Sequence, residues 1–133
     1  MEIAIQTDED KKIFKVDETI LLSLTVKNND DIELFILESC VSLDYKLTVK
    51  NEHGQLVFLT KEGQRLTNRG EIMCRNKKFK LEPGKSKQVS INLLSLYDVS
   101  AKGKYFISAS RSARKSDNSW IRAESNTIQV IIE

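Results

Sequence analysis

Apolar and polar residues alternate one by one along much of this chain. The pattern is cleanest in residues 43–50, where every second residue is apolar, and it recurs in residues 20–27, 89–93, 105–109 and 128–132. A strand places successive side chains on opposite faces, whereas a helix would spread these apolar residues around its circumference. The pattern therefore predicts strands that each bury one face.

Turn-forming residues separate several of these runs. Residues 28–31 (Asn-Asn-Asp-Asp) form one such break, and residues 51–54 are expected to close a hairpin with Gly54 at positive φ. In Glu82-Pro83-Gly84-Lys85, the Pro-Gly pair suits the two central positions of a type II turn. Residues 94–98 are expected to hold one short helical turn, and residues 110–119 an exposed loop.

The pattern and the turns together predict ten short strands. Their expected bounds are residues 2–7, 13–16, 19–27, 32–38, 43–50, 55–60, 72–80, 87–94, 103–111 and 119–132. Short strands at this spacing without a long helix are typical of a sandwich or a barrel. We therefore predict a single all-β domain over residues 1–133, an immunoglobulin-like antiparallel β-sandwich of about eight to ten strands.

Composition is that of an ordinary globular protein. The chain has 133 residues, 40% hydrophobic and 30% charged, which is enough for one core without metal ions or disulfides. No apolar run approaches the roughly 18 residues needed to span a bilayer. The N-terminus lacks the basic start and apolar stretch of a signal peptide. We therefore expect the protein to be cytoplasmic, or to be secreted if a signal peptide has been removed.

Charge and cysteine usage add two expectations. Residues 1–70 hold 13 acidic and 9 basic side chains, a net of −4, while residues 71–133 hold 6 acidic and 12 basic, a net of +6. Either this asymmetry gives the domain one acidic and one basic face, or the charged side chains are scattered over the surface. Cys40 and Cys74 have apolar neighbours, so we expect them to be reduced core residues, a disulfide between them being the alternative.

No catalytic or metal-binding constellation is present in the sequence. His53 is the only histidine and falls in a polar turn, where a catalytic base could hardly be buried and oriented. The pairs Asp8/Asp10 and Asp30/Asp31 lie in expected turns, so capping is favoured over a calcium site. We expect a protein that is not an enzyme and that has no cofactor and no metal.

Candidate partner-binding residues come from exposed apolar and basic positions. If alternate residues of a strand are buried, Phe106 and Phe58 turn outward, unless residues 61–75 cover them. Residues 75–80 and 111–115 are basic, and together with Trp120 and Phe106 they could also form a stacking platform for single-stranded nucleic acid. Because the pI of about 8.5 is moderate, we favour a protein partner over nucleic acid. The candidate contact residues are Phe58, Phe106, Arg111, Arg114 and Trp120.

Three motifs carry a resemblance to known families. Val26-Lys27-Asn28-Asn29, Leu81-Glu82-Pro83-Gly84 and Gly103-Lys104-Tyr105 resemble bacterial immunoglobulin-like domains, including the BsuPI family of intracellular proteinase inhibitors. The resemblance covers about residues 20–132. Gly103-Lys104-Tyr105 also fits a tyrosine corner, in which the Tyr105 hydroxyl bonds the backbone a few residues upstream. Antibody-type domains are not implied, because Ile107 stands where their second cysteine would be.

Three functions remain as hypotheses at this point. The first is a non-catalytic protein-binding module. The second, implied by the resemblance to BsuPI, is an inhibitor that inserts an extended loop, residues 61–75 or 110–119, into a subtilisin-like serine protease. The third is an accessory domain of a larger enzyme. The sequence does not determine the oligomeric state.

Overall fold

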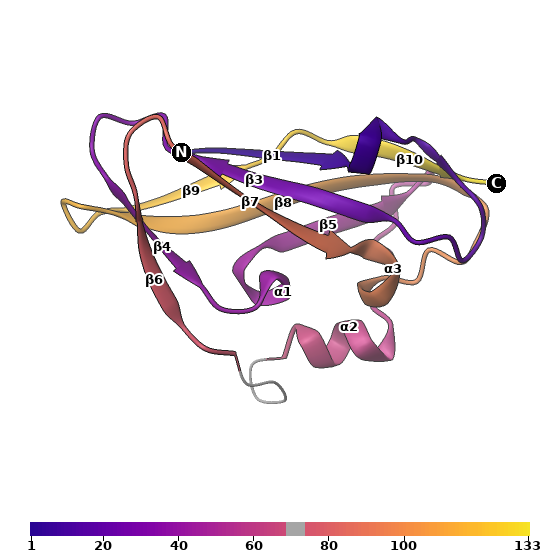
Figure 1. Ribbon diagram of the computed structural model, residues 1–133. Helices are drawn as coiled ribbons and strands as arrows, with labels where there is room; N and C mark the ends of the chain where they lie inside the picture. The colour runs from indigo at the N-terminus through magenta and orange to yellow at the C-terminus, as the bar shows by residue number, and fades with distance from the viewer. Residues whose placement is uncertain (69–73) are drawn as a thin grey trace.

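The computed structural model describes residues 1–68 and 74–133, and these form ten strands in two facing sheets (Figure 1). The smaller sheet has the order β1 (Glu2–Thr7), β3 (Leu21–Lys27), β7 (Ser86–Asn92). The larger sheet contains β2 (Ile13–Phe14), β4 (Leu34–Glu38), β5 (Lys46–Asn51), β6 (Lys77–Leu81), β8 (Gly103–Lys115), β9 (Trp120–Glu124) and β10 (Ile128–Ile132). The predicted immunoglobulin-like all-β sandwich is confirmed.

Short helices lie beside the sheets. Figure 1 shows α1, α2 and α3 gathered on one open side of the sandwich. They are α1 (Val41–Asp44), α2 (Lys61–Leu66) and α3 (Leu93–Leu96), with a 3-10 turn, η1 (Asp8–Asp10), after the first strand. The helical turn expected at residues 94–98 is therefore present, starting one residue earlier.

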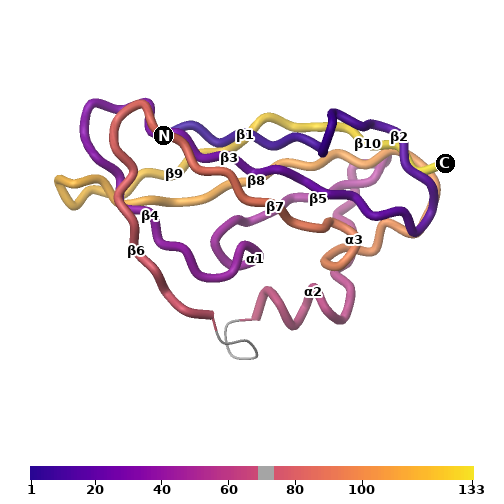
Figure 2. The backbone as a smooth tube through the Cα atoms, in the orientation of Figure 1, coloured from indigo at the N-terminus to yellow at the C-terminus, as the bar shows by residue number. Residues whose placement is uncertain are grey.

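β8 is the central strand of the larger sheet and pairs with four other strands. It is 13 residues long and pairs with β10 and β9 along one edge and with β5 and β4 along the other, always antiparallel. The backbone trace shows β6 and β4 running side by side at one end of the molecule (Figure 2). β2 pairs in parallel with β10.

The alternating residues form the core, as predicted. The inner face of β3 and the residue before it are almost fully buried, and Tyr45, Leu47 and Val49 follow the same rule around β5. The buried residues of the first group are Ile20, Leu22, Leu24 and Val26. Burying such aliphatic side chains is the main favourable contribution to folding, roughly 1.5–3 kcal/mol each.

Two predicted local motifs are present. The Tyr105 hydroxyl donates to the carbonyl oxygen of Ala101 at 2.6 Å, which is the expected tyrosine corner. Gly84 has φ of +82°, and the Lys85 amide donates to the Glu82 carbonyl, as the Pro-Gly turn requires.

Asn28 is a buried polar residue that links three segments. Its Nδ2 donates to the carbonyl oxygens of Ile32 and Leu81, each at 2.8 Å, and its Oδ1 accepts from the Asp30 amide at 3.0 Å. The backbone of Asn28 also bonds the Pro-Gly turn, accepting from the Gly84 amide at 2.7 Å. The sequence placed this asparagine in a turn but gave no sign that it is fully buried.

The expected last strand, residues 119–132, is instead two strands, β9 and β10. Asn126 lies in the break between them, where its side-chain amide accepts from the Ile5 backbone N–H and donates to the Ile5 carbonyl, both at 3.0 Å. A side chain thus supplies β1 with the hydrogen bonds that a neighbouring strand would otherwise give. The chain stays on β8 through this break, because the Ser125 amide donates to the Ala109 carbonyl at 2.7 Å, while Asn126 reaches across to the other sheet.

Residues 55–60 do not form the predicted strand. The turn before them is as expected, with Gly54 at φ of +76° and its amide bonded to Asn51. After single bridges at Leu56 and Leu59, the chain is drawn away to α3, because the Thr60 amide donates to the Leu96 carbonyl at 3.0 Å.

Three further boundaries differ from the expected ones. Residues 43–44 belong to α1 instead of β5, since the Asp44 carboxylate accepts from both the amide and the hydroxyl of Ser39 and closes a helical turn. The loop expected at residues 110–119 is mostly strand, because β8 continues to Lys115. Residues 72–73 of the predicted strand 72–80 lie outside the described residues, and β6 begins at Lys77.

Cys40 and Cys74 form a disulfide, so the expectation of reduced core cysteines was wrong. Their Cα atoms are 5.7 Å apart, within the usual range for a disulfide. Cys40 lies immediately before α1 and Cys74 shortly before β6, and both are only half-buried. The sequence could not reveal this pairing, because the 34-residue separation is bridged only by the tertiary fold.

Candidate functional site

A groove lies on the outer face of the larger sheet, where β4 separates from β8. The two strands pair only at Leu34–Lys115 and Phe35–Arg114. β5 pairs with the same edge of β8 only from Tyr105 to Ser110. Within the described chain, residues 111–113 of β8 therefore have no strand partner on this edge. The resulting groove has a volume of about 820 Å³.

Arg111 closes the inner side of this gap. Its side chain is only 8% exposed, and its Nη2 donates to the Leu37 carbonyl oxygen at 2.7 Å. The guanidinium lies over the Tyr45 ring, 4.7 Å from its centre, while its buried Nε has no hydrogen-bond partner. Burial raises the pKa of the Tyr45 hydroxyl, and the neighbouring Arg111 partly opposes this rise. Arg111 is thus a groove-lining residue in a strand, and not part of the exposed loop expected from the sequence.

Three groove-lining side chains, Phe35, Arg114 and Trp120, lie in a row across the sheet, and Lys80 extends this row beyond the groove. Lys80 of β6 is opposite Phe35 of β4, which is opposite Arg114 of β8, which is opposite Trp120 of β9. The Arg114 guanidinium is 5.5 Å from the centre of the Trp120 ring, within the range of a cation–π interaction. Trp120 is 69% exposed, so the ring and the cation both remain accessible.

Basic side chains surround the rest of the groove. Lys78 on β6 faces Leu37 across the strand pair, and Arg122 on β9 faces Ser112 and donates to the Ser110 hydroxyl at 3.2 Å. The groove-lining cations are Lys46, Lys78, Arg111, Arg114 and Arg122. Among the described residues, none of these five lies in an ion pair with a carboxylate.

The lining includes one acidic residue. Asp44 lies at the end of α1, and its carboxylate accepts from the Ser39 amide at 2.8 Å and from the Ser39 hydroxyl at 2.5 Å. Asp44 therefore has a structural partner of its own, and the groove keeps a net positive charge. Apolar surface between the cations comes from Phe35, Leu37, Leu43 and Trp120.

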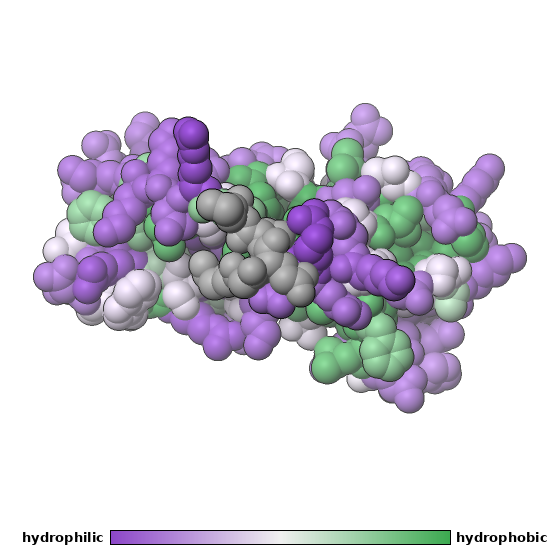
Figure 3. Space-filling view, turned by 90° about the horizontal axis from the view of Figure 1, so that it is seen from below, coloured by the Kyte–Doolittle hydropathy of each residue, from purple (hydrophilic) through white to green (hydrophobic). Residues whose placement is uncertain are grey.

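The other predicted contact residues lie away from the groove. Phe106 is half-buried on β8, between Lys50 and Gln129 of the neighbouring strands. Phe58 is 84% exposed and Leu56 68% exposed in the connection that follows β5. Apolar side chains also reach the surface among the hydrophilic ones in the view from below (Figure 3). Of the five predicted contact residues, the structure brings Arg111, Arg114 and Trp120 together.

In the residues that the structure describes, helix or strand makes up more than half of the two segments proposed as inhibitory loops. Lys61–Leu66 is the helix α2, capped by Thr60, whose hydroxyl oxygen accepts from the Gly63 amide. Residues 69–73 lie outside the described residues, and residues 110–115 belong to β8.

The residues considered for catalysis or metal binding remain scattered. His53 is exposed in its turn, and the Asp30 carboxylate is 2.7 Å from the Lys115 amine, which lowers the pKa of Asp30. Asp8 and Asp10 lie in η1. Across residues 1–68 and 74–133, no three His, Cys, Asp or Glu side chains group closely enough to share a metal ion. No helix in the same residues has the length and apolar character of a membrane span.

Comparison with known proteins supports the fold and assigns no function. No family model and no curated protein matches the sequence. The "Putative ApaA Protein from Bordetella pertussis" has a similar structure, with a TM-score of 0.54 over 98% of this chain and 90% of that one, at 4% identity. The structural-genomics target SoR45 has a TM-score of 0.52 over 98% and 84%, at 8% identity. Both support the fold, while the resemblance to BsuPI stays a prediction.

Proposed function

We propose that this chain is a non-catalytic protein-binding module that takes an extended acidic segment of a partner protein into the groove between β4 and β8. The observation that carries this proposal is the set of cations that surround exposed apolar side chains without ion-pair partners in the described chain. Cations held in this way attract a ligand of opposite charge and increase its rate of encounter.

The apolar residues of the groove give such a segment something to bind beyond its charge. Trp120 and Phe35 flank Arg114 in one cross-strand row, and Arg and Trp are the residue types that most often dominate binding energy. A strand-like peptide that crosses this row would lay carboxylates beside Arg114 and Arg122 and an apolar side chain against Trp120.

A protein segment is favoured over single-stranded nucleic acid by two features. Stacking successive bases requires several accessible rings along one track, and Phe106, the ring expected to serve this purpose beside Trp120, does not line the groove. The formal charge of the whole chain is only +2 and its pI is about 8.5, which is less basic than is typical of nucleic-acid-binding domains.

The test is a binding titration with a labelled decapeptide of Glu, Asp and Leu, compared with the same peptide carrying Gln and Asn. Binding should be selective for the acidic peptide. It should weaken as salt is added, because salt at 0.1 M screens the charges of the groove-lining cations over about 10 Å. Arg114→Gln and Trp120→Ala should each weaken binding about tenfold, which corresponds to about 1.4 kcal/mol.

Lys102→Gln is the matched control, since Lys102 is exposed before β8 and does not line the groove. Equal affinity for the acidic and amide peptides, or an equal loss in Lys102→Gln, would contradict the proposal. A single-stranded deoxythymidine oligonucleotide is the third probe, and tighter binding of this probe than of the peptide would reassign the groove to nucleic acid.

A further inference from the structure

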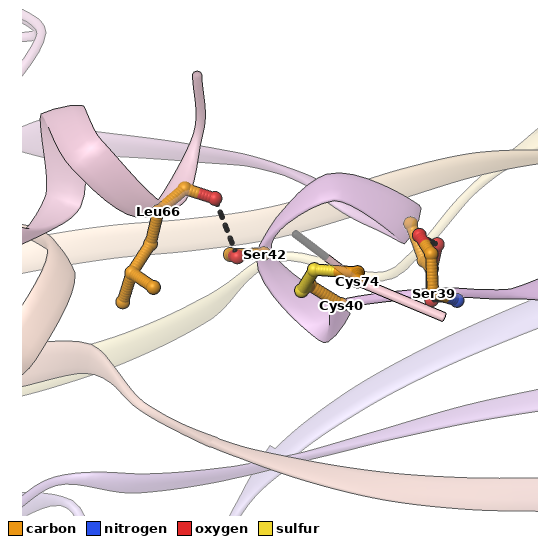
Figure 4. The surroundings of a disulfide bond; sticks show 6 residues. Ser39, Cys40, Ser42, Leu66 and Cys74 are labelled. Carbon is orange, nitrogen blue, oxygen red and sulfur yellow. Dashed lines mark hydrogen bonds between the residues drawn. A yellow bond between two sulfur atoms is a disulfide. The ribbon is translucent and has the colours of Figure 1, made fainter. Parts of the chain in front are cut away.

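We propose that the Cys40–Cys74 disulfide controls the groove by tying α1 to the segment that leads into β6, so that its reduction weakens ligand binding. This inference rests on the proposed function of the groove and adds its regulation. The bond joins the residue just before α1 to a residue three positions before β6 (Figure 4).

The two tied segments both contribute to the groove lining. α1 supplies Leu43 and Asp44, and β6 supplies Lys78. A displacement of α1 relative to β6 therefore changes the width of the groove and moves the one lining carboxylate relative to a lining cation.

Apart from Val41, which packs half-buried against the core, α1 has few other means of keeping its position. It has four residues, none of them fully buried, and a helix of this length is not stable by itself. The Ser39–Asp44 bonds are internal to the α1 region. Among the residues that the structure describes, the other side-chain hydrogen bond from α1 runs from the Ser42 hydroxyl to the Leu66 carbonyl at 2.7 Å, at the end of α2 (Figure 4). Besides the chain itself, which continues into β4 and β5 on either side, the disulfide is therefore the covalent link that holds α1.

By contrast, the remainder of the sandwich does not depend on the bond. β6 stays paired with β4 over five residue pairs, from Leu34–Leu81 to Glu38–Lys77. The core strands β3 and β8 contain no cysteine. Reduction is thus expected to loosen α1 and the start of β6 while the two sheets stay folded.

The chemistry needs a thiol reductant, and Cys40 and Cys74 are both half-buried instead of enclosed. A small dithiol attacks one sulfur, the S–S bond breaks, and a mixed disulfide forms. The second thiol of the reductant then displaces the protein cysteine from the mixed disulfide. Cys40 and Cys74 thereby become thiols, with two electrons and two protons gained, and the dithiol is oxidised to a cyclic disulfide.

The experiment measures affinity for the acidic decapeptide before and after reduction with a dithiol, with thiol titration to establish the state of the bond. We expect about tenfold weaker binding after reduction, and the same weak, reductant-insensitive binding in Cys40→Ser/Cys74→Ser. Amide hydrogen exchange should become faster in Val41–Asp44 and stay slow in Leu21–Lys27, which shows that the sheets remain folded.

Ser42→Ala is the second variant, because it loosens α1 with the disulfide intact. It should weaken peptide binding about threefold in the oxidised protein. If the oxidised protein does not bind the peptide, the proposed function itself is wrong. If it binds, and reduction and Ser42→Ala both leave the affinity unchanged, the proposed function stands and the control by the disulfide is overturned.

Discussion

Arg111 donates a side-chain hydrogen bond to the backbone carbonyl of Leu37 at the point where β4 and β8 stop pairing. A guanidinium thus replaces the ladder bond that a neighbouring strand would have made, and it keeps the two strands at a fixed separation. The groove exists because this substitution of side chain for backbone satisfies the carbonyl without closing the gap.

Arg111→Met should lower the free energy of unfolding by about 2–3 kcal/mol, the range for a buried hydrogen bond from a charged group whose acceptor is left unpaired. Methionine keeps much of the side-chain volume and removes the charge. Chemical denaturation measures the change. A variant as stable as the parent would show that the orphaned Nε already offsets the bond to Leu37.

Asn28→Ala should destabilise the fold by about 3 kcal/mol, since the carbonyls of Ile32 and Leu81 would lose their donor inside the protein. Asn29→Ala is the matched control, because Asn29 is the exposed next residue. Thermal unfolding of both variants should separate them clearly, and equal midpoints would refute the structural role given to Asn28.

Gly63→Ala should destabilise the packing of α2 on α3 strongly, by at least 2 kcal/mol, because an added Cβ would lie 2.0 Å from the Leu96 carbonyl oxygen. Gly54→Ala provides the comparison. Its φ is +76° and its surroundings are open, so only the cost of a left-handed backbone, about 1 kcal/mol, applies. The order of the two costs is the measured outcome, and the reverse order would contradict the close approach of α2 to α3.

Stability should decline at alkaline pH because burial raises the pKa of Tyr97, as well as those of Tyr45 and Tyr105. Each raised pKa favours the neutral phenol in the folded state. The contribution is complete below the unfolded value of about 10 and is lost as pH rises through the folded pKa.

Tyr97→Phe isolates one of these groups, since desolvation is the cause of its shift. Above pH 10, the free energy of unfolding of the variant should fall less steeply with pH, by up to about 1.4 kcal/mol per pH unit. Denaturation at a series of pH values, with tyrosinate absorbance as a second signal, checks this. Parallel curves for variant and parent would contradict it.

Local pattern predicted most of the sheets. Alternation found the buried faces around Leu22 and Val49, and turn chemistry placed Gly54 and Gly84 correctly. It failed where a distant partner decides the outcome. Residues 55–60 carry a strand pattern, but the bond from Thr60 to α3 removes them from the sheet. The end of β8 was missed because a charged residue, Arg111, occupies an inward position that the pattern reserves for apolar ones.

The groove was visible in the sequence only as separate parts. The basic residues 75–80 and 111–115 and Trp120 each stood out, but their meeting depends on the register that sets Lys80, Phe35, Arg114 and Trp120 in one row. Lys46 and Leu37 gave no signal, because nothing local indicates that β4 parts from β8 beside them.

The two hydrogen bonds between the Asn126 side chain and the Ile5 backbone join residues that are 121 positions apart. While the chain is being synthesised, β1 emerges well before Asn126, so the outer backbone groups of Ile5 stay without these bonds until that residue has been made. An open strand edge of this kind invites association with other chains. A nascent or truncated chain that stops before residue 126 is therefore expected to be prone to aggregation, and late closure by distant contacts is expected to make folding slow.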